Sequence, residues 1–496
     1  MAPPSRWLLF LTLGVVAVFT VLRLITASQL DLRSDEAYYW TWTQQSPLSF
    51  LDQPPMVAWF ERIGQRVVGN TALGVRFAQI LALPAIEILL ADIARRRTGQ
   101  WNAALFVVLA IECTLNYGLF SIVVEPSTPL LLFTGLILWS LVRLDETMDA
   151  RWWLLVGLGG GMALLSKYIV VLLAPSLLVF LLLDARHRQW MRTIWPYLAI
   201  LTAAVLFSPV IIWNARHEWA SFAFQSSRLG SGEASTVGGL GRFLLYETLW
   251  VGPILLLAAP VGAVALLVSA LRRRQPVEAM IATAFLFPFG WLAVRSFTLQ
   301  INQSWAWFLW PIGMLALAVV LPWERGRRRI AALVLAMTTV SVPAIAALFW
   351  HASFDRSVWF GRGDPFGQDA GYAEMADKVL ARARENGATW IATTEYRTYA
   401  NLLWHIGSRI SVVQVNERAR FLDFAPVDSR LLAGRALYVH LSPAPPLLSD
   451  VVATPLAPLA VSWRGVPMQD FSVDLLSAYR PNLDPPPGSP AYVWRN

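Results

Sequence analysis

The sequence predicts an all-α polytopic membrane protein with about eleven transmembrane helices, followed by a small C-terminal α/β domain. Of its 496 residues, 56% are hydrophobic and only 15% are charged, whereas soluble domains carry about 25% charged residues. Long apolar runs recur along the chain and are separated by short arginine clusters. These observations exclude an ordinary soluble enzyme and a disordered chain, and the single cysteine excludes a disulfide framework.

Apolar runs of suitable length mark the predicted spans. A bilayer core about 30 Å thick requires ~20 apolar residues in a helix. The first run is too long for a cleavable signal peptide, and no small-residue cleavage site follows it before Asp31. The predicted spans lie near residues 7–27, 72–94, 102–120, 126–143, 152–168, 169–183, 194–213, 243–270, 277–297, 304–321 and 330–350.

Arginine clusters between these runs predict the orientation of the chain. With eleven spans, the clusters fall on the same side as Arg6, and loops rich in Lys and Arg face the cytoplasm. The clusters are residues 95–97, 186–192, 272–274 and 325–329. We therefore expect three long segments on the extracytoplasmic side, namely residues 28–71, 214–242 and 351–496. Since clusters of this kind are typical of membrane loops, the net charge of +8 does not indicate nucleic-acid binding.

The composition changes after the last predicted span. We expect a membrane domain over residues 1–350 and a C-terminal domain over residues 351–496. The C-terminal segment contains a helix-like run, residues 370–385, and short β-like segments at residues 390–393 and 436–439. A helix followed by such strands predicts a small α/β domain.

The first outer loop combines carboxylates with aromatic residues. It contains residues 34–40, SDEAYYW, and residues 52–59, DQPPMVAW. Aromatic helices of this kind lie in the membrane interface with their rings among the headgroups. Asp35 and Glu36 would then lie at the level of a lipid-linked phosphate. The structural alternative is that Asp35 caps the helix and Glu36 only favours its first turn.

These two segments resemble motifs of bacterial polyprenyl-phosphate-sugar glycosyltransferases of the protein O-mannosyltransferase-like group. Further similar segments are residues 164–168, LLSKY, and residues 209–219, PVIIWNARHEW, and the resemblance extends over residues 30–230. The group has the multi-span fold called GT-C. It includes aminoarabinose transferases of lipid A and rhizobial lipopolysaccharide galacturonosyltransferases.

The resemblance implies a reaction at the outer face of the bacterial inner membrane. One sugar would pass from a polyprenyl-phosphate donor to an envelope acceptor, with inversion at the anomeric carbon. The acceptor could be lipid A or another glycolipid, a polysaccharide or a protein. The first-loop aspartate of the group matches Asp35, which would be the general base that takes the proton of the acceptor hydroxyl.

Glu36 and Asp52 would assist this base. Glu36 would orient it or act electrostatically, unless it is merely a solvated first-turn acid. Asp52 would bind substrate or a metal beside Asp35, unless it only caps a turn or a helix. No cofactor is certain. A divalent metal could bind Asp35 and Asp52, but Gln53 stands where many relatives have a histidine.

A second departure from the group concerns the outer start of the fourth span. Relatives often have a Pro-Asp pair there, whereas this chain has Ser127 in the place of the aspartate, and Glu125 could supply the carboxylate instead. The alternative is that both residues simply begin a helix.

Lys167, near the outer end of the fifth span, would meet the negative charge of the departing lipid phosphate. Snorkelling to the interface would also explain that lysine.

Further substrate-binding candidates lie on the outer side. Arg216, His217 and Arg228 are cations on the side where the positive-inside tendency disfavours them, and phosphate binding would explain their presence. Tyr168 and Asn214 belong to the motifs that resemble the glycosyltransferases and complete the predicted set.

A transporter or flippase for a lipid-linked sugar is the alternative function. Transporters usually show paired repeats and charges near mid-bilayer, whereas the ionisable residues here gather at the outer ends of spans, which favours an enzyme. A ligand-sensing role stays open for residues 351–496.

No P-loop or Rossmann glycine pattern is present, so a nucleotide-sugar donor is not expected. The glycine-rich run at residues 157–161 lies in an apolar span and predicts close helix packing.

Overall fold

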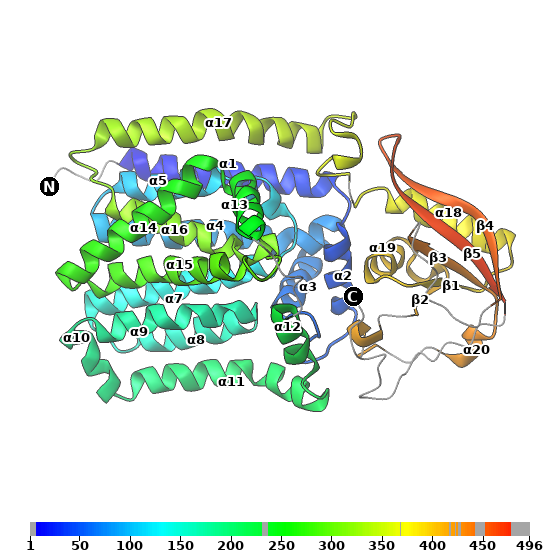
Figure 1. Ribbon diagram of the computed structural model, residues 1–496, viewed down its shortest axis with the longest axis horizontal. Coiled ribbons are helices and arrows are strands. Elements are labelled where there is room, and N and C mark those ends of the chain that lie inside the picture. The colour runs from blue at the N-terminus through cyan, green and yellow to red at the C-terminus, as the bar shows by residue number, and fades with distance from the viewer. Residues whose placement is uncertain are drawn as a thin grey trace. The chain divides into compact units, whose positions relative to one another are not determined.

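The computed structural model divides into two compact units (Figure 1). We call Met1–Ala27 with Gln53–Trp350 the helical unit, and Ser28–Asp52 with His351–Asn496 the sheet unit. The structure describes residues 6–230, 237–367, 369–415, 418–421, 423–424, 428–441 and 452–477.

The helical unit consists of helices, and its long members run roughly parallel in Figure 1. They begin with α1 at Arg6–Gln29 and end with α17 at Arg327–Ser353. Those between are α3 (Met56–Val68), α4 (Ala72–Thr98), α5 (Trp101–Glu112), α6 (Leu115–Gly118), α7 (Ser127–Thr147), α8 (Trp152–Leu164), α9 (Ala174–Leu182), α10 (Ala185–Arg188), α11 (Trp195–Arg216), α12 (Ala220–Gly230), α13 (Val237–Val251), α14 (Pro253–Arg273), α15 (Pro276–Arg295) and α16 (Trp310–Val320).

Within the described residues, 7 helices are long and apolar enough to cross a membrane, and a bent pair would make 8. The bent pair is Tyr168–Leu182 with Ala185–Arg192. Shorter apolar helices are Trp101–Glu112, Trp152–Leu164 and Trp307–Val320. Each of the eleven predicted runs therefore contains a helix from one of these three groups, and the predicted polytopic helical fold is confirmed.

Two predicted spans have the wrong limits. The run 243–270 is not one helix, because Gly252 has φ +86 and Pro253 begins a new helix there, as proline favours the first helical turn. The run 102–120 is helical only to Glu112 before the chain turns into the short α6. Thr114 caps α6 by accepting a hydrogen bond from the backbone of Tyr117.

Glycines allow α8 to pack closely against α11, as the glycine-rich run predicts. A Cβ atom on Gly157 would lie 2.6 Å from the carbonyl oxygen of Ala199, and one on Gly161 would lie 2.6 Å from Cβ of Leu206. Small residues at such positions let helices approach closely in a membrane.

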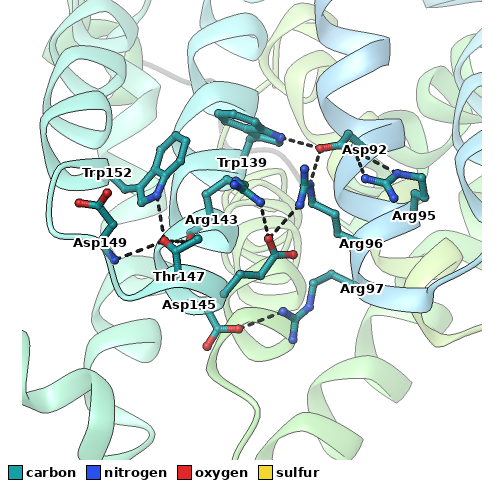
Figure 2. A network of polar contacts seen from close by, with 11 residues as sticks. Asp92, Arg95, Arg96, Arg97, Trp139, Arg143, Asp145, Thr147, Asp149 and Trp152 are labelled. Carbon is teal, nitrogen blue, oxygen red and sulfur yellow. Dashed lines mark hydrogen bonds and ion pairs between the residues drawn. The ribbon is translucent and has the colours of Figure 1, made fainter.

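Arginines at the end of α4 form a network with acids on neighbouring helices (Figure 2). Asp92 accepts hydrogen bonds from Arg95 and Arg96. Arg97 donates to Asp145 at 2.9 Å and to Glu278 at 2.6 Å, and so joins α4 to α7 and α15. This end of α7 is about 27 Å from Ser127 at the other end, at 1.5 Å rise per residue.

The sheet unit contains a 5-stranded sheet with strand order β2-β1-β3-β5-β4. The strands β2, β1 and β3 are parallel, and β5 pairs antiparallel with both β3 and β4. The predicted small α/β domain is thus confirmed. Its elements are α18 (Tyr372–Glu385), β1 (Trp390–Thr393), α19 (Tyr396–Ile406), β2 (Ser411–Gln414), α20 (Ser429–Leu432), β3 (Ala436–Leu441), β4 (Val452–Trp463) and β5 (Val466–Ser477).

The first-loop helix α2 (Ser34–Thr43) packs against α19 inside the sheet unit. The rings of Trp40 and Trp404 lie 5.0 Å apart, and Asn401 donates a hydrogen bond to Ser34 at 3.0 Å. Residues 28–52, expected as part of the membrane domain, therefore group with residues 351–496 in the structure. The functional division into residues 1–350 and 351–496 stays a prediction.

Candidate active site

The start of α2 is fixed by a capping box around Glu36. Oε2 of Glu36 accepts a hydrogen bond from the backbone N–H of Arg33 at 2.8 Å, and the Glu36 side chain is fully buried. Arg33, not Asp35, is the N-cap residue. In this structure Glu36 thus stabilises the helix start, which is the structural alternative considered for it, and a role in catalysis stays a prediction.

The two carboxylate oxygens of Asp35 differ in their contacts. Tyr396 donates its hydroxyl hydrogen to Oδ1 of Asp35 at 3.0 Å, and Nε of Arg397 lies 3.9 Å from the same oxygen. The Asp35 side chain is 52% exposed, and Oδ2 has no hydrogen-bond partner among the residues that the structure describes. An anchored carboxylate with a free oxygen is suited to accept a proton from an incoming hydroxyl.

Asp52 is buried and both of its oxygens have partners. Tyr38 donates to Oδ2, and Arg420 forms an ion pair with Oδ1. Burial and the charge of Asp52 raise the pKa of Tyr38 well above its usual value, so this hydroxyl stays a donor. Asp52 is not the N-cap of the following helix, since Pro55 takes that position.

The carboxylates do not form a recognisable metal site. Among the described residues, no group of three or more His, Cys, Asp and Glu side chains could hold a metal ion. The Arg420 guanidinium already pairs with Asp52. Divalent cations such as Mg²⁺ and Ca²⁺ prefer several oxygen ligands, so the residues present do not fit the metal considered for Asp35 and Asp52.

Lys167 is the centre of a second cluster, in the helical unit. It follows α8 in an extended backbone conformation and is only 5% exposed. Its Nζ donates to Oγ of Ser127 at 3.0 Å and to the carbonyl oxygen of Ser304 at 3.3 Å. Oε2 of Glu125 lies 3.9 Å from Nζ. Glu125 and Ser127 therefore do more than begin α7, because both contact a buried cation.

Arg228 adds a second positive charge to this cluster. Its guanidinium lies 5.9 Å from the ring centre of Trp305, the residue after Ser304, and 5.5 Å from that of Phe224. Two cations with one neighbouring carboxylate leave a net positive charge. Cations and hydroxyls arranged in this way can bind a phosphate.

Tyr168 and Asn214 both contact Ser221, at the start of α12. The hydroxyls of Tyr168 and Ser221 lie 2.9 Å apart, and Oδ1 of Asn214 accepts a hydrogen bond from the backbone N–H of Ser221 at 3.1 Å. The amide group of Asn214 also donates to the carbonyl oxygen of Val210 at 3.0 Å. These residues hold the helix that carries Arg228, and their binding to substrate stays a prediction.

The remaining candidates lie at the end of α11. Nδ1 of His217 is 2.8 Å from the carbonyl oxygen of Trp213, and the two rings stack 4.2 Å apart. Arg216 is exposed. The structure gives neither residue a contact with Lys167, so their part in phosphate binding also stays a prediction.

The contacts of these clusters that the sequence did not reveal include those made by Ser304, Tyr396 and Arg420. No local signal marks them, because each is far along the chain from the residue that it contacts.

A backbone hydrogen bond joins two of the motif segments, residues 52–59 and residues 164–168. Met56 donates its backbone N–H to the carbonyl oxygen of Leu165 at 3.1 Å.

Comparisons with known proteins support the resemblance. Residues 52–213 match the family model described as dolichyl-phosphate-mannose-protein mannosyltransferase. The chain is 27% identical to the lipid A galacturonosyltransferase RgtD of Rhizobium johnstonii over 255 residues, which is 48% of this chain and 52% of that protein. It is 31% identical to an undecaprenyl phosphate-alpha-4-amino-4-deoxy-L-arabinose arabinosyl transferase of Pseudomonas aeruginosa over 174 residues, 33% of this chain and 30% of that protein. The chain thus spans about half or less of the length of these relatives.

Solved structures share the fold. ArnT from Cupriavidus metallidurans, bound to undecaprenyl phosphate, superimposes with a TM-score of 0.64 at 15% identity, covering 96% of this chain and 99% of that one. The archaeal oligosaccharyltransferase AglB from Archaeoglobus fulgidus gives a TM-score of 0.55 at 10% identity, covering 86% and 69%. These similarities confirm the fold expected from the motifs.

Proposed function

We propose that this chain, whose motifs and fold resemble those of the bacterial polyprenyl-phosphate-sugar glycosyltransferases, is a membrane enzyme of that kind. It transfers one hexosyl or pentosyl unit from a polyprenyl-phosphate donor to an acceptor in the cell envelope. The observation that supports this most is the state of Asp35, a half-exposed carboxylate with one anchored and one open oxygen. The relatives described above suggest lipid A as an acceptor class, and galacturonate or aminoarabinose as sugar classes.

The reaction assigns a chemical task to each cluster. Asp35 takes the proton of the acceptor hydroxyl while the hydroxyl oxygen bonds to the anomeric carbon. The bond from that carbon to the phosphate oxygen breaks, and the polyprenyl phosphate leaves with its negative charge. Lys167 and Arg228 bind this phosphate, because fixed cations stabilise charge that develops as the leaving group departs.

The charges on α4 and α7 indicate which end of the helical unit faces the cytoplasm. The arginine network lies at the end of the helical unit that contains Arg97, and arginine-rich ends face the cytoplasm. Lys167 contacts Ser127 at the opposite end of α7. We therefore place the Lys167 cluster on the periplasmic side of the inner membrane, where lipid-linked sugars meet lipid A.

Replacement of Asp35 tests the proposal. With a labelled undecaprenyl-phosphate aminoarabinose or polyprenyl-phosphate galacturonate donor and purified lipid A, Asp35→Asn should lower transfer by at least about 100-fold, the contribution of a general base. Asp31→Asn is the matched control, since Asp31 is a first-loop aspartate that pairs with His405 instead. Transfer by Asp35→Asn at the wild-type rate would contradict the assignment. Mass spectrometry of envelope glycolipids from cells with and without the gene would identify the sugar and the acceptor.

A further inference from the structure

We propose that Tyr396 and Arg420 are positioning residues for the two first-loop aspartates, and that Arg420 supplies the positive charge that a divalent cation would otherwise bring to Asp52. The inference rests on the proposed function, in which Asp35 is the base. It gives the sheet unit a direct part in the reaction. Transfer then needs no metal ion at these aspartates.

The charge of the buried Asp52 carboxylate is balanced by protein side chains. Its side chain is 11% exposed, and a buried carboxylate is unfavourable unless it is paired and hydrogen-bonded. Arg420, 15% exposed, provides the charge at Oδ1, and Tyr38 provides a hydrogen bond at Oδ2. The charge that a metal ion would bring to Asp52 is therefore already supplied by Arg420, and little of the side chain is left exposed to a further ligand.

The ring of Tyr396 connects Asp52 with Asp35. The guanidinium of Arg420 lies 4.4 Å from the centre of that ring, a favourable distance for a cation–π contact. The ring of Tyr38 lies 4.8 Å from the same ring at an angle of 60°. The hydroxyl of Tyr396 then donates to Asp35. The side chain that orients the base is therefore held by the two partners of Asp52.

The side chains of Tyr396 and Arg420 have little conformational freedom. Tyr396 is the first residue of α19, and α19 is held against α2 by Trp404 and Asn401. Phe421, next to Arg420, is 2% exposed and packs against the ring of Tyr399 at 4.8 Å. Packed neighbours of this kind keep a catalytic group in its productive orientation.

Three variants test the inference on the full-length enzyme in detergent. Arg420→Gln removes the charge at similar size, Arg420→Lys keeps it, and Tyr396→Phe removes only the hydroxyl. We expect Arg420→Gln to lower kcat at least about tenfold with donor KM changed less than about threefold, since it alters the reacting group and not donor binding. Arg420→Lys should recover most of that loss. His405→Gln, on the same helix but paired with Asp31, is the matched control and should keep the wild-type kcat.

The split between kcat and KM separates positioning from simple folding. In Tyr396→Phe the Asp35 carboxylate loses the hydrogen bond that orients it. We expect kcat, counted per folded enzyme recovered by size-exclusion chromatography, to fall at least about tenfold with donor KM changed less than about threefold, because the reacting group and not donor binding is altered. Wild-type transfer should be unchanged by an excess of EDTA.

The outcomes distinguish this inference from the proposed function. An active wild-type enzyme that is inhibited by EDTA and restored by a divalent metal overturns the cation role of Arg420. Wild-type kcat in both Arg420→Gln and Tyr396→Phe overturns the positioning role. If Arg420→Gln does not fold, Tyr396→Phe decides by the same measurement. Failure of the proposed function differs from all of these, since the wild-type protein would then transfer no sugar from a polyprenyl-phosphate donor.

Discussion

The ammonium group of Lys167 donates a hydrogen bond to Oγ of Ser127, 3.0 Å away at the first residue of α7. Nearly all of this lysine is buried, and the carboxylate of Glu125 is 3.9 Å from Nζ. A buried cation with a single nearby carboxylate keeps some of its capacity to bind another anion. The arrangement explains why a lysine stands at the end of an apolar helix, where the snorkelling alternative would leave its head group in water.

Lys167→Met should therefore weaken donor binding more than acceptor binding. We expect the KM for the polyprenyl-phosphate sugar to rise at least about tenfold, because a charge-assisted hydrogen bond to phosphate contributes more than ~1.4 kcal/mol. Steady-state kinetics with both substrates varied would show this. The chain has one other lysine, Lys378, which pairs with Glu374 on α18, and Lys378→Met is the matched control. A larger effect on acceptor KM than on donor KM would reassign Lys167.

The protonated hydroxyl of Tyr396 should stabilise the folded protein, and this contribution to the free energy of unfolding should be lost at alkaline pH. Burial and the negative charge of Asp35 raise the pKa of Tyr396, so its hydroxyl remains protonated in the folded state when an unfolded tyrosine, with a pKa of about 10, would ionise. A pKa raised by folding stabilises the protein fully below the unfolded pKa, and this contribution falls as the pH rises toward the folded pKa.

The measurement compares thermal unfolding of the wild type and Tyr396→Phe between pH 8 and pH 11, a range around the tyrosine pKa of about 10. Groups that titrate in both proteins cancel in the difference. The stability advantage of the wild type over Tyr396→Phe should be constant below that pKa and shrink above it. An advantage that grows with pH would contradict the direction of the shift.

The fold was largely predictable because membrane insertion depends on local composition. Each apolar run is a continuous property of about 20 residues, and every run contains a helix. The limits failed at Gly252 and Glu112, where a positive φ or a cap ends a helix within an apolar stretch. Hydropathy does not register these backbone features.

The candidate site was predictable only in part. Asp35, Asp52 and Lys167 lie in short motifs and could be found from the sequence alone. Tyr396 contacts Asp35 across 361 positions of the chain, and Arg420 contacts Asp52 across 368. Such pairings are set by tertiary packing in the sheet unit. Glu36 differs, because its position beside Asp35 suggested catalysis, whereas its side chain closes a local capping box with Arg33.

Arg97 should be a major stabilising residue at the end opposite Lys167. It joins Asp145 and Glu278, and the exposed fractions of the three side chains are 18%, 16% and 8% (Figure 2 shows the pairing with Asp145). Arg97→Met leaves the poorly solvated Glu278 without its cation and Asp145 with His187 alone, and we expect a loss of about 2 kcal/mol of unfolding free energy. Thermal unfolding in detergent checks this. Arg151→Met is the control, because Arg151 is 81% exposed, and an equal fall in both variants would refute the role of burial.

The packing of α8 against α11 predicts opposite outcomes for two neighbouring glycines. A Cβ atom on Gly157 would lie 2.6 Å from the carbonyl oxygen and 2.7 Å from Cα of Ala199, and backbone atoms cannot move aside as a flexible side chain can. Overpacking of this kind costs about 1–3 kcal/mol. On Gly160 the nearest atom would be Cβ of Ala203 at 3.6 Å, an ordinary contact.

Gly157→Ala should therefore lower the unfolding temperature. Gly160→Ala should leave it unchanged or raise it, since alanine is favoured over glycine in a helix by about 1 kcal/mol. Both variants add one methyl group to the same helix, so helix propensity alone predicts the same sign for both. Equal stabilisation of the two variants would show that α8 and α11 do not approach each other this closely in the membrane. Destabilisation of Gly157→Ala alone would show that the helix contact, and not glycine flexibility, is what this position requires.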